Sequence, residues 1–423
     1  MTQPTAANAF STANPHALAT ILEASETRTI IASRDIFDLS GIKLWARDQP
    51  VSSALQRKLL DRQLRNPLET CLSVENGVTP ASLVQAIQAL LASDSPLSAL
   101  LRPHATRIVA EAAQLPLHSV AQLLLTAGQA SRPASFDHAV QGMALAGALM
   151  MAQGGTTIEL RLAMLGGLLH DLGEMYIDPR FGEADAERTL DLTSYQQLVV
   201  HPHVGQLLLT QLTNYPPALA RAVAEHHERL DGSGYPHRLQ RDAVSPLGRL
   251  LATTEAALAV LRGERPYLSR ISVALRVVPG EFDLRWAGHI AASARVQPAL
   301  HAAMGADEVQ VRLSRLDSAL STAQENAVAL LASAETAALK DALTLAQFLL
   351  GRLRTGWNAS GLWSSEAVST QDSAEIESVE DELFHRLHAI ERAARLRAGN
   401  LPPADAHRLD LLCAGLRGGD PQA

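Results

Sequence analysis

Histidines and acids gather between Phe136 and Tyr267, and their residue types suit metal-ion chemistry. In chain order they are His138, His170, Asp171, His201, His226 and His227. Neutral imidazoles and a carboxylate are ligands that iron, manganese and zinc prefer. Each histidine lies in a segment that otherwise has the apolar periodicity of a helix. Spread over four such segments, these residues are the set that a two-metal site in a helical bundle needs.

The sequence around these residues resembles the HD-GYP domain, a branch of the HD metal-dependent phosphohydrolases. The matching blocks are Leu168 to Gly173, His201 to Gly205, His226 to Leu230, Asp231 to Pro236, Pro246 to Gly248, and Arg265 to Tyr267. They follow the family's order at nearly its spacing, over roughly 170 residues of helical pattern. The resemblance implies a mainly α fold, with an HD-type helical bundle as its core.

The resemblance also implies roles for the individual residues. Asp171 would bridge two divalent metal ions, of iron, manganese or zinc, and His170 would ligate one of them, so that this pair is the catalytic centre. His138, His201 and His226 match the family's remaining ligating histidines. Without the family, a His-Asp pair is a common polar end to a helix, and a lone histidine on an apolar helix is more often a core residue.

His227 follows His226 directly, and on a continuing helix its side chain would point about 100° away from that of its neighbour. In some family members the second histidine serves a third metal, helped by a glutamate four residues before the first histidine. That position is Ala134 here, which argues against a third ion. His227 stays among the candidate metal ligands, and His203 is expected at the surface.

The loop Gly234-Tyr235-Pro236 and Arg265 are the candidate substrate-binding residues. By resemblance, the loop would lie near a cyclic dinucleotide site or contact GGDEF-type cyclase domains, and Arg265 matches a family arginine that meets substrate phosphate. Glycine permits tight backbone geometry and proline fixes the exit from the turn. Without the family, the loop would be a plain helix-ending turn and Arg265 a solvated surface charge.

Two positions depart from the family. Its usual lysine three residues after Asp171 is Glu174 here, and a carboxylate would repel phosphate unless it is protonated or binds metal. A further metal-binding aspartate is expected on the next helix, where alignment without gaps places Ala256. Glu255 becomes its equivalent only if a gap is allowed, and it starts on a different helical face, but it is kept as a candidate metal ligand. The departures fall on the chemistry and leave the fold signature largely intact.

Composition excludes several classes of protein. Of the 423 residues, 47% are hydrophobic and 4% aromatic, with Ala and Leu in bulk, which favours helix. A net charge of −8 without a long basic tract argues against DNA, RNA or a membrane as partner. The two cysteines, Cys71 and Cys413, imply no disulfide framework. With neither a secretory signal nor an apolar run of ~20 residues, we expect a cytoplasmic protein.

The elements that must position the site fall into four predicted regions. Residues 1–26 are expected to be a disordered tail, and residues 27–130 a small α+β unit with linking helices. Residues 131–305 would form the metal-binding domain. Residues 306–423 would be helical, with a loop near 356–375.

Within these regions, strands are predicted at 29–32, 42–45 and 69–74, and a helix at 52–65. The predicted core helices are Phe136–Met151, Ile158–His170, Leu190–Leu212, Pro217–Leu230 and Leu247–Arg262. Helical periodicity also runs from Val309 to Arg354. An apolar stripe from Ile376 to Ala394 would either pair two chains as a homodimer or cover the core of its own domain.

Two functions remain open at this point. The first is metal-dependent hydrolysis of cyclic di-GMP in bacterial second-messenger signalling, giving linear pGpG or GMP. The alternative is a non-catalytic HD-GYP domain that binds a cyclic dinucleotide or a partner protein. Glu174 and Ala256 favour the second function, whereas the complete histidine set favours the first. The Gly-Tyr-Pro loop argues against a phosphohydrolase that acts on another nucleotide.

Overall fold

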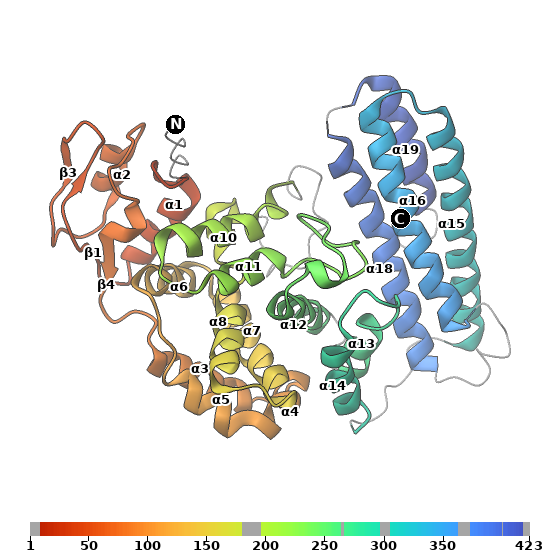
Figure 1. Ribbon diagram of the computed structural model, residues 1–423, viewed down its shortest axis with the longest axis horizontal. Coiled ribbons are helices and arrows are strands. Elements are labelled where there is room, and N and C mark those ends of the chain that lie inside the picture. The colour runs from red at the N-terminus through yellow and green to blue at the C-terminus, as the bar shows by residue number, and fades with distance from the viewer. Residues whose placement is uncertain are drawn as a thin grey trace. The chain divides into compact units, whose positions relative to one another are not determined.

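The computed structural model describes residues 9–179, 196–263, 266–296, 305–362, 373–399 and 401–417 (Figure 1). The chain divides into two compact units, Met1–Thr189 with Gln197–Arg262, and Leu190–Gln196 with Gly263–Ala423. Both consist mainly of helices, so the predicted mainly α fold is confirmed. Within the described ranges, no helix is long and apolar enough to cross a membrane.

Two small antiparallel sheets lie near the start of the first unit. Their elements are β1 (Ile30–Ala32), β2 (Ile36–Phe37), β3 (Lys43–Trp45), α2 (Ser53–Leu59), η1 (Leu68–Cys71) and β4 (Leu72–Val74). Strand β1 pairs with β4, and β2 pairs with β3. The strands predicted at 29–32 and 42–45 are confirmed, the one predicted at 69–74 is confirmed only from Leu72 because η1 occupies its first half, and β2 is an additional strand. The helix predicted to reach residue 65 ends at Leu59, because Leu60 has an extended ψ of 127°.

A series of helices follows the sheets in the first unit. They are α3 (Pro80–Ala92), α4 (Pro96–Leu101), η2 (Arg102–His104), α5 (Ala105–Ala112) and α6 (Ser119–Ser131). Pro80 and Pro96 open α3 and α4, where the missing N–H of proline has no intrahelical partner to lose.

Helix α1 (Pro15–Ser25) lies in the segment predicted to be a disordered tail, so that prediction is wrong from residue 15 onward. The side chain of Asn14 caps the helix by accepting two backbone N–H bonds from its first turn. Leu18 and Ile21 are buried, and the helix packs against α6. Burial of these apolar side chains stabilises a segment whose neighbours are small and polar.

The candidate site residues lie on the core helices of the first unit. The elements are α7 (Pro133–Ala152), α8 (Thr157–Leu169), η3 (Leu172–Tyr176), α10 (His201–Leu212), α11 (Pro217–Glu225) and α12 (Pro246–Arg262). Four of the five predicted core helices are confirmed apart from their limits. The helix predicted at Leu190–Leu212 is confirmed only from His201, because a turn at residues 199–200 precedes α10 and residues 190–195 lie outside the described part. Helix α11 ends well before the predicted limit at Leu230, which matters for the site.

Helices α7 and α8 cross at two glycines that bring their backbones into contact. A Cβ atom on Gly167 would lie 2.2 Å from the carbonyl oxygen of Gly142, and one on Gly142 would lie 2.5 Å from that of Gly167. His138 lies one turn before Gly142, and His170 lies about one turn after Gly167. The crossing therefore brings the two imidazoles to the same point in the bundle.

A second close approach sets Asp171 beside His201. A Cβ atom on Gly173 would lie 2.0 Å from the carbonyl oxygen of His201. The turn η3 therefore packs directly on the first turn of α10. Any larger residue at position 173 would push the histidine away from the aspartate that precedes the turn.

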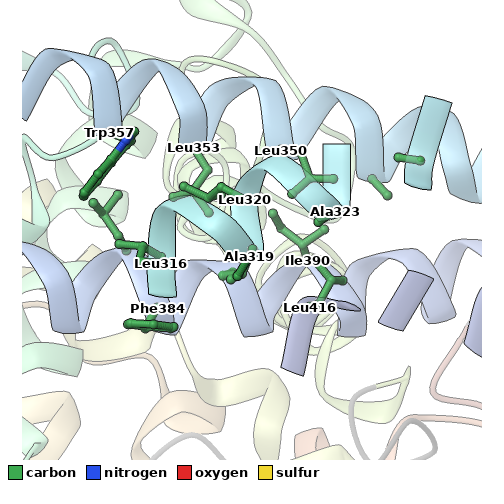
Figure 2. Close-up of a cluster of buried hydrophobic side chains, with 14 of the residues drawn as sticks. Leu316, Ala319, Leu320, Ala323, Leu350, Leu353, Trp357, Phe384, Ile390 and Leu416 are labelled. Carbon is green, nitrogen blue, oxygen red and sulfur yellow. The ribbon is translucent and has the colours of Figure 1, made fainter. Parts of the chain in front are cut away.

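The second unit contains a helical bundle. Its described elements are α13 (Leu268–Ala274), α14 (Leu284–Ala294), α15 (Ala306–Ser333), α16 (Ala337–Ser360), α18 (Ser373–Ala398) and α19 (Pro403–Arg417). Figure 2 shows part of its apolar core, where Leu316, Leu320, Leu353 and Trp357 are almost fully buried. The predicted stripe is buried here too, at Ile376, Leu383, Leu387, Ile390 and Ala394. It covers the core of its own unit, which was one of the two predicted alternatives.

Two limits in this unit differ from the prediction. The helix predicted from Val309 to Arg354 is two helices, because Thr336 begins α16 by accepting a hydrogen bond from the backbone N–H of Leu339. The loop predicted near 356–375 starts later, since α16 continues to Ser360, where Gly361 ends it with a φ of 73°. Residues 363–372 of that loop lie outside the described part.

Ion pairs lie along the same bundle. Arg312 contacts Glu380 at 2.7 Å and Asp381 at 3.1 Å. Glu380 is 1% exposed. Burial raises the pKa of Glu380 to about 7 despite the opposing charge of Arg312, and the nearby acids Asp381 and Glu377 add to the rise. The carboxyl group is therefore easier to protonate in the folded chain than in the unfolded chain.

Replacing Gly167 by Ala tests the helix crossing. We expect Gly167→Ala to lower the free energy of unfolding by about 1–3 kcal/mol, because the added methyl group must displace the α7 backbone. Gly288→Ala in α14 is the control, since nothing lies within 4 Å of its added Cβ. That control should be neutral or stabilising by up to about 1 kcal/mol. Urea denaturation measures both, and equal stabilities for the two variants would contradict the close crossing.

Glu380→Gln tests the buried acid. Between about pH 4.5 and 7 the folded wild type holds a proton that the unfolded chain has released, so its stability falls as the pH rises through this window. The variant lacks this loss. The difference in unfolding free energy between variant and wild type should therefore shift in favour of the variant by about 1–3 kcal/mol from pH 4.5 to pH 8. Glu325→Gln, at an exposed position of α15, should show no such pH difference in chemical denaturation.

Candidate metal centre

Buried polar side chains from five segments converge within the first unit. They are His138 of α7, His170 and Asp171 at the end of α8, His201 at the start of α10, His226 and His227 after α11, and Glu255 of α12. The histidines and the glutamate are at most 5% exposed, and the aspartate side chain is 10% exposed. Seven ionisable groups in one dry volume are costly unless they share charges or a cation.

The first ligand group consists of His138, His170, Asp171 and Glu255. The Nε2 atom of His138 lies 2.8 Å from Oε2 of Glu255 and 3.2 Å from Oδ2 of Asp171. The Nε2 atom of His170 lies 3.1 Å from that same Oδ2 and 3.2 Å from the glutamate oxygen. Donor atoms held about 2 Å from a common ion are separated by about 3 Å, so these spacings fit a metal site.

The second ligand group consists of His201, His226, His227 and Asp171. The Oδ1 atom of Asp171 lies 3.4 Å from Nε2 of His201 and 3.3 Å from Nε2 of His226. The Nε2 atoms of these two histidines are 3.1 Å apart. Asp171 therefore turns one carboxylate oxygen to each group, which is the arrangement of a bridging carboxylate.

Hydrogen bonds on the outer side of three rings orient them for ligation. The Nδ1 atoms of His170, His201 and His226 lie 2.8, 2.6 and 2.6 Å from the backbone carbonyl oxygens of Gly167, Leu198 and Val223. A carbonyl oxygen can only accept, so each Nδ1 carries a proton and donates it. The ring orientation is fixed from behind, and Nε2 is the atom directed at the ion.

The electrostatics differ between the two groups. Burial lowers the pKa of His226 to about 3, so its ring is neutral near pH 7 and ready to ligate. Burial also disfavours charge on His170, but Asp171 and Glu255 outweigh it and hold the pKa of His170 well above its ordinary value. A metal ion that binds Nε2 of His170 must therefore displace a proton from that atom, whereas Nε2 of the neutral His226 carries none.

His227 lies in the second group, contrary to the expectation that it could not share the face of His226. The expectation assumed a continuing helix. Helix α11 ends at Glu225, so the chain has left the helix at these two residues, and their ring centroids are 4.1 Å apart. The ring of Tyr235 stacks on His227 at 4.5 Å. That no third ion binds, as Ala134 indicates, stays a prediction.

Glu255, and not Ala256, is the acid that α12 supplies to the first group. Alignment without gaps therefore gave the wrong residue. Position 255 faces α7 and α8 and is 2% exposed. A glutamate has one more methylene than an aspartate, and its longer reach compensates for the shift of one residue along the helix. An acid is therefore present in the ligand group where the departure put one in doubt.

The Gly234-Tyr235-Pro236 loop folds back on the second group. A Cβ atom on Gly234 would lie 2.4 Å from the carbonyl oxygen of His227, so no residue larger than glycine fits at this position without a shift of the backbone. The backbone N–H of Tyr235 donates to that same oxygen at 3.1 Å. The loop thus positions His227, while its predicted contact with substrate stays a prediction. Arg265 lies outside the described residues.

Glu174 is buried beside Arg132 rather than directed at solvent. Arg132 donates to the backbone carbonyl of Glu174 at 3.0 Å, and the glutamate charge supports the charged form of the arginine against the cost of burial. A small cavity of about 40 Å³ adjoins both residues, with Asp171, Phe136 and Met175 also in its lining. This volume has room for a few water molecules. The neighbouring cation offsets the carboxylate that was expected to repel phosphate.

Two arginines at this site were missed by the sequence analysis. Arg132 precedes α7, and Arg262 ends α12 with its side chain 17% exposed. Arg262 lies two turns after Glu255 on the same helical face, and that spacing was the available signal. His203 is exposed, as expected.

Residues 118–278 match the sequence profile of the HD domain. This stretch of the chain is an HD domain. Its His170-Asp171 pair and its Gly234-Tyr235-Pro236 loop give it the HD-GYP form that the sequence predicted. The buried donor atoms around Asp171 belong to the side chains that such a domain would use to bind metal.

Named relatives align with parts of this chain. A cyclic di-GMP phosphodiesterase of Pseudomonas aeruginosa is 31% identical over 166 residues, which are 39% of this chain and 39% of that protein. A 3′3′-cGAMP-specific phosphodiesterase of Vibrio cholerae is 31% identical over 106 residues, or 25% of this chain and 22% of that protein. A cyclic di-GMP phosphodiesterase response regulator of Xanthomonas campestris is 32% identical over 110 residues, which are 26% of this chain and 28% of that protein.

The chain spans well under half the length of these relatives. Among solved structures, an HDG"Y"P protein from Bdellovibrio bacteriovorus is 13% identical and covers 62% of this chain and 94% of that chain. Its TM-score is 0.34, too low to support an argument about this fold.

Asp171→Asn tests the shared carboxylate of the HD domain. Because Asp171 contributes an oxygen to each ligand group, its loss should lower the bound divalent metal at both groups, by at least about tenfold in affinity. His203→Ala, at an exposed position of α10, is the control and should bind as wild type does. Elemental analysis after dialysis against a fixed concentration of Mn²⁺ measures this. Retention of wild-type metal by Asp171→Asn would contradict the bridging role.

Proposed function

We propose that this HD domain is a metal-dependent phosphodiesterase that hydrolyses cyclic di-GMP, with two divalent ions of iron, manganese or zinc as cofactors. The observation that carries the proposal is the carboxylate of Asp171, which divides its oxygens between two groups of buried histidines. The names of the relatives support a cyclic dinucleotide as the class of substrate. Their coverage of the chain is partial, so the activity stays a proposal.

The chain's own residues would bind the two ions and keep the ligand side chains oriented. His138, His170 and Glu255 would hold one ion, and His201 and His226, with His227, would hold the other. The bonds from Nδ1 atoms to backbone carbonyls keep the rings aimed while the ligands are exchanged. The proposed ions would lower the pKa of an attacking water and offset charge on the phosphoryl oxygens.

Hydrolysis adds the oxygen of one water molecule to phosphorus and breaks the bond from phosphorus to the 3′ oxygen, which leaves with a proton. The products are linear pGpG or, after a second cleavage, GMP. Arg265 and the Gly234-Tyr235-Pro236 loop stay proposed substrate contacts.

A second function is favoured by one specific feature. Glu174 stands where the family has a lysine, so the site has lost a cation that would meet phosphate. The alternative is therefore an HD-GYP domain that binds a cyclic dinucleotide or a partner, such as a GGDEF-domain protein, without turning the nucleotide over. A homodimer and a cytoplasmic location are further proposals.

Turnover separates the two functions. Purified chain with Mn²⁺ or Fe²⁺ should convert cyclic di-GMP to pGpG or GMP, and His226→Ala should lose at least about 100-fold of that rate, because a ligand is removed. His203→Ala should keep it. Chromatography of products measures the rate, with 3′3′-cGAMP run in parallel to assign the substrate. Tight binding of the nucleotide without products would favour the non-catalytic function.

A further inference from the structure

Arg262 reaches into the first ligand group from the end of α12. Its Nη1 atom lies 2.9 Å from Nδ1 and 3.2 Å from Nε2 of His138. Its Nη2 atom lies 2.8 Å from Oε1 of Glu255. The guanidinium group thus contacts two of the four candidate ligands of this group.

The contact with His138 is chemically unlike the contacts of the other rings. His170, His201 and His226 face carbonyl oxygens behind the ring, which require a proton on Nδ1. His138 faces a guanidinium, which can only donate, so either Nδ1 or Nε2 of the ring must accept from it. If Nδ1 accepts, the neutral ring carries its proton on Nε2, and if Nε2 accepts, its lone pair is occupied, so in both cases Nε2 cannot ligate a metal. Ligation by His138 therefore requires Arg262 to move away.

Charge adds to this conflict. Arg262 pairs with Glu255, the acid that belongs to the first group alone, whereas Asp171 is shared with the second group. A divalent ion among the first ligands would lie within a few ångströms of a fixed positive charge. Even with strong screening, repulsion at such a distance changes an equilibrium constant by tenfold or more.

We propose that Arg262 competes with the metal ion for His138 and Glu255, so that the two ligand groups have unequal affinities. The second group fills first, and the first group fills only when the guanidinium releases its two partners. The inference rests on the proposed function in one respect, namely that both groups bind divalent metal. It assigns to Arg262 the role of a built-in competitor at one of them.

The test measures Mn²⁺ binding to the full chain by equilibrium dialysis and calorimetry, without nucleotide. Wild type should show one tight and one weak class of site. Arg262→Met keeps the length and apolar stem but removes the cation, and it should raise the affinity of the weak class at least about tenfold. The tight class should change less than about twofold. Arg262→Lys, which keeps the charge, should stay closer to wild type.

A second readout uses wild type alone, so it does not depend on whether the variant folds. With one equivalent of Mn²⁺, electron paramagnetic resonance should show an isolated ion, and spin-coupled pairs should form only with further metal. Coupled pairs at one equivalent, or unchanged affinities in Arg262→Met, would overturn the competition while leaving a two-metal site intact. Absence of any bound Mn²⁺ in both proteins would overturn the proposed function as well.

Discussion

The structure depends on one carboxylate shared between two sets of imidazoles in a dry interior. Asp171 turns one oxygen to His138 and His170 and the other to His201 and His226. An anion at this depth would be expensive without positive partners. The histidines around it hold the pKa of Asp171 well below its ordinary range despite burial, so the carboxylate stays charged and available to cations.

The surrounding fold exists to hold these donors within about 3 Å of each other. Three helix ends and two helix interiors contribute ligands, and contacts through glycine remove the side chains that would keep the backbones apart. Carbonyl oxygens at the ends of helices accept from Nδ1 atoms, so the same unsatisfied groups that end a helix also orient its histidine. The same helix ends therefore contribute both to the close packing and to the orientation of the ligands.

Much of the fold and site could be predicted from the sequence, for physical reasons. The period of apolar residues predicted the core helices, and histidines at their ends predicted the ligand set. The predictions that were wrong depended on where a helix ends or on how far a side chain reaches. His227 was thought to face away because the sequence does not reveal that α11 ends at Glu225. Glu255 was kept as a candidate ligand, but the gapless alignment placed Ala256 at the family's position because it cannot register a longer side chain.

Long-range contacts account for the rest. Helix α1 was missed because its stability comes from packing against α6, far along the chain, rather than from its own composition. Arg262 was passed over because only the folded chain brings it to His138. Such contacts leave no local pattern for the sequence to display.

Anomalous X-ray diffraction from crystals grown with Mn²⁺ tests the central claim most directly. The account predicts two peaks, one on each side of the Asp171 carboxylate, the first ligated by His170 and Glu255 and the second by His201 and His226. A lone peak away from Asp171, or histidine rings turned so that Nε2 faces the helices, would contradict it.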